Sequence, residues 1–377
     1  MKRRDFIVKS GCGVIAGLGS SAFGKSISND AAKGDAFCFF LLGDLHYDRL
    51  IDHDFDLLSA GHRKQIEHYS RATLENSPFL IEAMKKKISA STMPVPYIIQ
   101  LGDFTQGLCG SEELATQQLT RFTKWIDDHK LGSPFVVIKG NHDITGPGAK
   151  SAYSEVVFPW QSKILNRPIE TDCYFFRHKN VLIINFYEHN PNSLEWLLDT
   201  LEEEASKSEH VIVLSHAPFI ANSARAHWGV YLQSGKRVED SVTAIEALGR
   251  HKAILLTGHL HKYSVLSRKT PQGGIVQLAL SSIMKDRKNA IQKELITKDY
   301  GLNLINAEPG WDPKSLERRK EIIENEKPHI QFFEYANAPG YAQITVKGKD
   351  VSFEMYAGPN FELYKKVNVS KLLEGFS

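Results

Sequence analysis

Five short apolar runs, each followed at once by polar residues of the kinds that bind metal ions, constrain the fold of this chain more than any other feature. The runs are rich in β-branched and aromatic residues and are bounded by glycine or polar residues, which is typical of buried strands. They cover residues 37–42, 97–101, 135–138, 211–214 and 254–257. The sequence therefore predicts strands whose carboxyl ends all carry polar side chains.

Segments long enough to form helices lie between these strands. The clearest covers residues 193–206, where leucines recur at helical spacing and Asn192 or Ser193 is placed to cap the first turn. Further helices are expected at 67–89 and 112–128. Alternation of strands and helices predicts an α/β fold. The charged fraction of 24% is ordinary for a globular protein, so the composition does not favour disorder.

The pattern changes after residue 261. Strands are expected at 264–268 and 274–280, with a hairpin formed by 341–346 and 351–356. The polar stretch 285–328, with a helix expected at 313–326, is interpreted as an insertion that borders the site. The predicted organisation is thus one catalytic domain over residues 35–362, followed by a C-terminal tail over 363–377.

The polar residues at the strand ends form a candidate metal site. Ligands of open α/β sheets gather beyond the carboxyl ends of the strands, so these side chains are expected to meet. Their nitrogen and oxygen atoms suit Mn, Fe or Zn. Seven ligands exceed what one tetrahedral zinc uses, whereas two ions sharing a carboxylate and a bridging hydroxide would use them all. The seven are Asp44, His46, Asp103, Asn141, His216, His259 and His261.

The order of these motifs resembles that of the calcineurin-like metallophosphoesterase family. The chain contains D-x-H at 44–46, G-D at 102–103, G-N-H-D at 140–143, a lone His216, and G-H-x-H at 258–261. The resemblance implies a four-layer α/β/β/α sandwich with two mixed β-sheets and a metal site at the carboxyl ends of the strands. It also implies hydrolysis of a phosphate mono- or diester, a small phosphorylated substrate, by in-line attack of a metal-bridging hydroxide.

The resemblance assigns roles to individual residues. One ion would be held by Asp44, His46, Asp103 and His261, and the other by Asp103, Asn141, His216 and His259. His142 would protonate the leaving oxygen or stabilise phosphoryl charge, because an imidazole can donate a proton near neutral pH. Asp143 would orient His142, and the competing interpretation is that Asp143 caps a turn.

Two departures indicate a branch of the family. His46 stands where purple acid phosphatases carry another residue, and the segment 102–106 lacks their metal-binding tyrosine. The sequence is therefore placed closer to the phosphodiesterase-like members. Candidate substrate contacts are Arg225, His227, Trp228, Lys262 and Tyr263, with Trp228 able to stack on a nucleobase or another flat group. Each could equally be a solvated loop charge or a core aromatic residue.

Two other interpretations of function stay open. The chain could be an inactive or scaffold protein on the same metal-binding fold, or a hydrolase of a non-phosphate ester, because the fold alone does not fix the substrate. An inactive member would be expected to lose ligands or the histidine of G-N-H-D. This sequence keeps all of them, which argues against a scaffold.

Residues 1–24 are interpreted as an export signal. Arg3, Arg4 and Phe6 precede a modestly apolar, glycine-rich stretch, an order that resembles a twin-arginine signal, and a general secretory signal is the alternative. Export by the twin-arginine machinery to the periplasm, or secretion, is therefore expected. Loss of the segment removes four basic residues and one acidic residue and changes the formal charge from +2 to −1, which predicts no nucleic-acid surface. No later run approaches the roughly 20 apolar residues of a membrane span, and no stable membrane anchor is predicted.

Overall fold

The computed structural model describes residues 36–232, 238–283, 286 and 291–375. The expected export signal at 1–24 lies outside these residues, as do parts of the expected insertion. Residues 33–377 form one compact unit. Among the described helices, none combines the length and the apolar character that crossing a lipid bilayer requires.

The first of two sheets has six strands in the order β14-β13-β12-β1-β2-β3. Its central strands β1, β2 and β3 are parallel, so their carboxyl ends share one edge, whereas β12, β13 and β14 are joined by antiparallel pairing. The strands are β1 (Phe37–Leu42), β2 (Ile98–Gln100), β3 (Phe135–Val137), β12 (Gly340–Lys347), β13 (Asp350–Ala357) and β14 (Glu362–Asn368).

The second sheet has eight strands in the order β10-β11-β8-β9-β7-β6-β5-β4. Strands β5, β6, β7 and β9 are parallel, and the others pair antiparallel, so this sheet is mixed as well. The strands are β4 (Tyr174–His178), β5 (Val181–Phe186), β6 (His210–Ser215), β7 (Ile254–Thr257), β8 (Tyr263–Thr270), β9 (Gly273–Ala279), β10 (Gln292–Ile296) and β11 (Ile330–Asn337).

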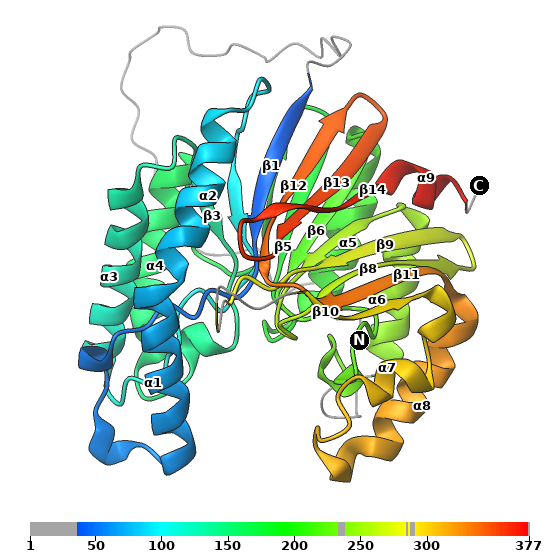
Figure 1. The fold of residues 1–377 in the computed structure, drawn as a ribbon. Helices are drawn as coiled ribbons and strands as arrows, with labels where there is room; N and C mark the ends of the chain where they lie inside the picture. The colour runs from blue at the N-terminus through cyan, green and yellow to red at the C-terminus, as the bar shows by residue number, and fades with distance from the viewer. Residues whose placement is uncertain (1–35, 233–237, 284–285, 287–290, 376–377) are drawn as a thin grey trace, which may run out of the picture. The chain divides into compact units, whose positions relative to one another are not determined.

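Helices cover the outer face of each sheet (Figure 1). On the first sheet lie α2 (Ser77–Ser89), α3 (Glu112–His129) and α4 (Ala149–Leu165), with α1 (Ala60–Glu75) against α2. On the second lie α5 (Ser193–Glu204), α6 (Val238–Arg250), α7 (Leu302–Asn306) and α8 (Leu316–Glu326). The short α9 (Val369–Glu374) packs against β13 and β9.

Strand β1 shows why the layers form. Its odd-numbered residues, among them Phe39, join the apolar core between the two sheets, and its even-numbered residues, among them Phe40, join the core under α2–α4. Successive side chains of a strand point to opposite faces, so an uninterrupted apolar strand must be buried on both. The predicted α/β/β/α sandwich is confirmed.

Several expected boundaries need correction. The helix expected at 67–89 is two helices that meet at Asn76, because Pro78 lacks a backbone N–H and sits in the first turn of α2. Asn192 precedes α5 in a left-handed conformation and makes no side-chain cap bond. The expected tail is also wrong: β14 pairs with β13, and Val367 and Val369 are buried. Within the expected insertion, β10 extends the second sheet.

Candidate metal centre

The loops after β1, β2, β3, β6 and β7 bring the predicted polar residues together. The loops after β1 and β2 are tied directly, because the backbone N–H groups of Leu45 and His46 both donate to the carbonyl oxygen of Asp103. The loop after β7 is tied to the one after β1, since the N–H of His259 donates to both carboxylate oxygens of Asp44, at 2.9 and 3.1 Å. Residues more than 200 positions apart thus share one buried site.

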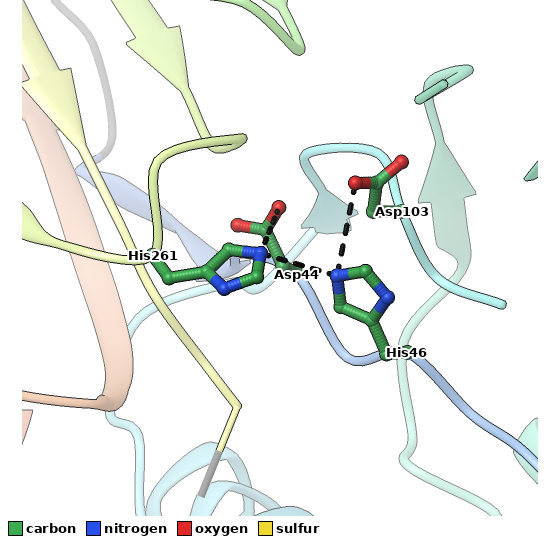
Figure 2. A group of neighbouring side chains, drawn as sticks. All are labelled: Asp44, His46, Asp103 and His261. Atoms are coloured by element: carbon green, nitrogen blue, oxygen red, sulfur yellow. Dashed lines mark hydrogen bonds and ion pairs between the residues drawn. The ribbon is translucent and has the colours of Figure 1, made fainter. Parts of the chain in front are cut away.

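Asp44, His46, Asp103 and His261 form the first ligand group (Figure 2). The Nε2 atoms of His46 and His261 are 3.1 Å apart, His261 Nε2 is 3.5 Å from Asp44 Oδ1, and His46 Nε2 is 3.7 Å from Asp103 Oδ2. Two ligands that each bind one ion at about 2.1 Å lie about 3.0–3.4 Å apart. The separation of the two Nε2 atoms lies in this range and the other two exceed it by 0.1 and 0.3 Å, so a small inward shift would let the four side chains hold a single ion.

Asp103, His216 and His259 form the second group, so Asp103 belongs to both. His216 Nε2 is 3.0 Å from Asp103 Oδ2 and 3.2 Å from His259 Nδ1. Asn141 Oδ1, from the loop after β3, is buried and has no hydrogen-bond partner among the described residues. Buried polar atoms without partners are rare, and a cation would satisfy this oxygen. The buried groups are those of a dinuclear metal site, and its residues fit two ions.

Burial controls the protonation of the imidazoles. It lowers the pKa of His46 and of His259 to about 3, and it lowers the pKa of His261 well below its usual value. Burial acts in the same direction on His216, but the Asp103 carboxylate outweighs it and raises the pKa of His216 to about 10. Three imidazoles are thus neutral and able to ligate, whereas His216 must release a proton before it can bind a metal.

The two buried carboxylates, Asp44 and Asp103, have pKa values that are shifted in opposite directions. Burial raises the pKa of Asp44 to about 7. Burial would do the same to Asp103, but the neighbouring His216 and His142 hold its pKa well below the usual range. Asp103 is therefore the permanent anion of the site, as the residue shared by both groups must be.

Hydrogen bonds behind the ligands set which imidazole nitrogen faces the site. His46 Nδ1 donates to Oε1 of Gln106 at 2.7 Å, and His216 Nδ1 donates to the carbonyl of Leu101 at 2.8 Å. Each bond keeps the proton on Nδ1 and turns Nε2 toward the ligand group, where His216 Nε2 gains its lone pair once the second proton has left; such partners orient metal-binding histidines. Tyr69 of α1 also stacks on the His46 ring at a centroid distance of 4.4 Å.

The backbone is strained at the site. His46, Asp103, His259 and His261 all have left-handed φ values, between 44° and 71°. Non-glycine residues rarely adopt this conformation, and it persists only where the surrounding structure enforces it. Gly140 is needed for a different reason: a Cβ there would lie 2.1 Å from the backbone nitrogen of Asp103.

Residues 39–263 match the family described as calcineurin-like phosphoesterases. This match covers more than half of the chain. The chain belongs to the calcineurin-like phosphoesterase family. No curated protein matches the sequence.

Solved structures share the fold of this calcineurin-like phosphoesterase. They include a purple acid phosphatase, PPD1, from seeds of yellow lupin (Lupinus luteus), with a TM-score of 0.53 over 88% of this chain and 53% of that one. A dimetal phosphatase from Danio rerio gives 0.51 over 88% and 98%, and a structure of PhoD gives 0.50 over 89% and 69%. Each is 12% identical to this chain. The chain spans about half the length of the lupin protein, and these likenesses describe the fold alone.

The structure changes the role expected for Asp143 in this phosphoesterase. Its carboxylate accepts hydrogen bonds from the backbone N–H groups of Asp103, Thr105 and Gly140, at 2.8–3.0 Å, and from the Thr105 hydroxyl. The ring of His142 instead donates from Nδ1 to the carbonyl of Gln106 at 3.0 Å. Asp143 therefore fastens the loops after β2 and β3 and does not orient His142, which corrects the expectation.

The candidate substrate contacts divide into two sets. Tyr263 is fully buried between the sheets, where it stacks on Phe353, so the expectation of a substrate contact is wrong for this residue. The partly exposed residues Arg225, His227 and Trp228 lie in the segment after β6, and the Trp228 ring is 5.5 Å from that of His259. Lys262 bonds Glu308 of the expected insertion.

Several residues that shape the site were not singled out from the sequence. Gln106 orients both His46 and His142, and Gln100 joins the first two loops by bonding the carbonyls of Gly43 and Gly102. Glu308 and Trp311 come from the expected insertion. The glutamines were detectable as polar residues in or next to a buried strand, whereas nothing in the sequence near 308–311 marks a contact with the site.

Proposed function

We propose that this phosphoesterase hydrolyses a phosphate mono- or diester, with His142 assisting departure of the leaving group. The observation that carries the proposal is the sharing of Asp103 between two buried ligand groups directly beside His142, whose backbone N–H donates to Asp103 Oδ1 at 2.7 Å. Two adjacent cations and one proton donor are what phosphoryl transfer to water requires.

Asp44, His46, Asp103 and His261 would hold one ion, and Asp103, Asn141, His216 and His259 the other. When bound, such ions activate water and neutralise charge on phosphoryl oxygens. Asp103 contributes the permanent negative charge, and Gln106 and the Leu101 carbonyl keep the imidazole lone pairs aimed inward. The mixed ligand set suits Mn, Fe or Zn, and metal analysis of the purified protein would identify the two ions.

His142 is suited to proton transfer at Nε2. Its Nδ1–H is committed to the Gln106 carbonyl, so a second proton can reside only on Nε2. The ring lies 4.6 Å from that of His46, edge to face, which places it at the rim of the first ligand group. From there, His142 would give its proton to the leaving oxygen.

Within the family, we place the chain nearer to the phosphodiesterase-like members than to the purple acid phosphatases. The G-D segment has no tyrosine, and its Gln106 holds a histidine ligand in place instead. Metal analysis and the absorption spectrum test this placement. A tyrosinate-to-iron absorption band in the visible would contradict it.

The test of function is hydrolysis of p-nitrophenyl phosphate and bis-p-nitrophenyl phosphate by chelated protein, before and after addition of Mn, Fe or Zn. We expect metal to restore cleavage, and the faster substrate identifies monoester or diester chemistry. Failure to cleave either ester with both ions bound would favour the scaffold interpretation, and cleavage of carboxylate esters alone would favour a different hydrolase.

We also propose that residues 1–24 direct export by the twin-arginine machinery to the periplasm. The support is the order of residues in that segment. Replacing Arg3 and Arg4 together by lysine should leave the protein in the cytoplasm. Export that continues unchanged in a strain lacking the twin-arginine machinery would indicate the general secretory route.

A further inference from the structure

Two tryptophans, Trp228 and Trp311, form an aromatic surface beside the second ligand group, and this surface is called the aromatic wall below. The ring of Trp228, in the short helical turn Ala226–Trp228 after β6, lies 5.5 Å from that of His259 and is tilted by 37°. Trp311 meets Trp228 edge to face at 5.1 Å. Both tryptophans are partly exposed, and an exposed tryptophan next to a reaction centre has a flat apolar surface to offer a ligand.

The wall is held rigidly although its halves come from distant parts of the chain. Arg319 of α8, 1% exposed, donates to the carbonyl of Ala224 at 2.9 Å and to that of Trp311 at 2.7 Å. The Arg225 guanidinium lies 4.0 Å from the centre of the Trp311 ring. The segment around Trp311 is therefore fastened to the loop that follows His216, and the two rings keep a fixed relation.

Glu308 neutralises only part of the positive charge beside the two tryptophans. Glu308 pairs with Arg225 at 3.1 Å and with Lys262 at 3.3 Å, so two cations share one carboxylate and one positive charge remains. A cationic, aromatic surface facing a phosphate site matches an anionic ester with a planar substituent.

Two buried nitrogens in the wall have no hydrogen-bond partner among the described residues. They are Nε1 of Trp311 and Nδ1 of His227. Leaving such atoms unpaired is unfavourable, and a polar edge on a bound planar group would satisfy them. These two nitrogens thus lack a hydrogen-bond partner of the kind that the polar edge of a planar heteroaromatic group has.

We propose that Trp228 and Trp311 form a subsite for a planar aromatic group of the substrate, either an aryl group or a nucleobase, next to the phosphate. This inference rests on the proposed function, because the phosphate of the same molecule would occupy the metal centre. The expected insertion is then a specificity element, since it supplies Trp311, Glu308 and Arg319.

The test compares matched substrate pairs and does not rely on total activity. For metal-loaded protein, the ratio of kcat/KM for phenyl phosphate to that for glycerol 3-phosphate reports recognition of an aryl group. The ratio for adenosine 5′-phosphate to ribose 5-phosphate reports a nucleobase. Stacking of this kind is worth about tenfold or more in discrimination. Trp228→Leu and Trp311→Leu should lower at least one ratio by about tenfold, and Trp228→Phe should retain most of it.

A binding measurement separates the subsite from the chemistry. Calorimetric titration with phenylphosphonate and methylphosphonate gives the preference for an aromatic group without hydrolysis. The remote Trp160→Leu, on α4 against Phe122 and Phe135, is the matched control and should keep the wild-type preference. Circular dichroism shows whether each variant folds.

Each outcome decides one of the two proposals. Wild-type protein that prefers phenylphosphonate and loses the preference in Trp228→Leu, yet cleaves no ester, supports the subsite and refutes the phosphoesterase function. Protein that cleaves esters with the same ratios in folded Trp228→Leu and Trp311→Leu as in the wild type refutes the subsite and leaves the function standing.

Discussion

Replacement of Gln106 by methionine tests whether the residues behind the ligands control metal binding. Gln106 accepts the Nδ1–H of His46 at 2.7 Å, while its own Nε2 is buried without a partner among the described residues. Methionine has nearly the same length and shape but cannot accept this bond strongly. The carbonyl that holds His142 belongs to the backbone and is kept.

Gln106→Met should have two separate effects, one on metal affinity and one on the stability of the metal-free protein. Loss of the partner of a metal-binding histidine lowers metal affinity about 10- to 100-fold, or about 1.4–2.8 kcal/mol. The apo protein loses one hydrogen bond and leaves His46 Nδ1–H unpaired, but it also loses the unpaired Gln106 amide. These terms are each about 1–3 kcal/mol and oppose one another, so the free energy of unfolding without metal should change little.

Calorimetric titration of chelated protein with Mn²⁺ measures the first effect, and thermal unfolding in chelator measures the second. Gln343→Met, on β12 at a glutamine that bonds Thr345, is the matched control and should keep full affinity. Wild-type affinity in Gln106→Met would refute the reasoning. So would a loss of affinity accompanied by an equal loss of apo stability, because the residue would then act through folding.

Three further predictions concern the ligands and their neighbours. Asp103→Asn should nearly abolish turnover in the p-nitrophenyl assays, because both ligand groups share this carboxylate; wild-type-like rates would exclude the two-ion mechanism. His142→Ala should lower kcat by about 10²- to 10⁴-fold with an unchanged melting temperature, whereas Asp143→Ala should lower the free energy of unfolding by about 3 kcal/mol; the opposite pattern would restore Asp143 as a catalytic group. Metal affinity should fall about tenfold for each unit of pH below 9, because metal displaces the proton of His216, and more steeply below about pH 7, where Asp44 is protonated as well; calorimetric titration from pH 6 to 9 would contradict this with a flat profile.

The part of the fold that the sequence predicted is the part set by local pattern. β1 and β7 begin and end where their predicted runs do, because a strand buried on both faces consists mainly of apolar residues. Within each sheet the ligands follow from the same logic, since the parallel strands of one sheet point their carboxyl ends to one edge. The helix boundary at Asn76 was missed because the apolar pattern continues across it, although Pro78 was a visible signal.

The rest of the site depends on contacts between distant segments. Asp143 follows His142 directly in sequence, yet its carboxylate turns toward Gly140, Asp103 and Thr105, and only the packing of two loops determines that direction. Trp311 reaches the site because Arg319 fastens its segment more than 80 residues beyond Trp228. Neither the direction of the Asp143 carboxylate nor the position of Trp311 can be predicted from the spacing of residues in the sequence.

The energetics of the site argue that metal binding is what maintains it. Asp44 and Asp103 are both buried within one cluster, and two like charges in a low-dielectric environment disfavour each other. Four residues in left-handed conformations add a cost of about 1–3 kcal/mol each. The three apolar cores can hold such a structure, but apolar packing does not itself favour two neighbouring buried carboxylates. Only a bound cation converts the paired carboxylates, the neutral imidazoles and the unpaired oxygen of Asn141 from a cost into a favourable interaction.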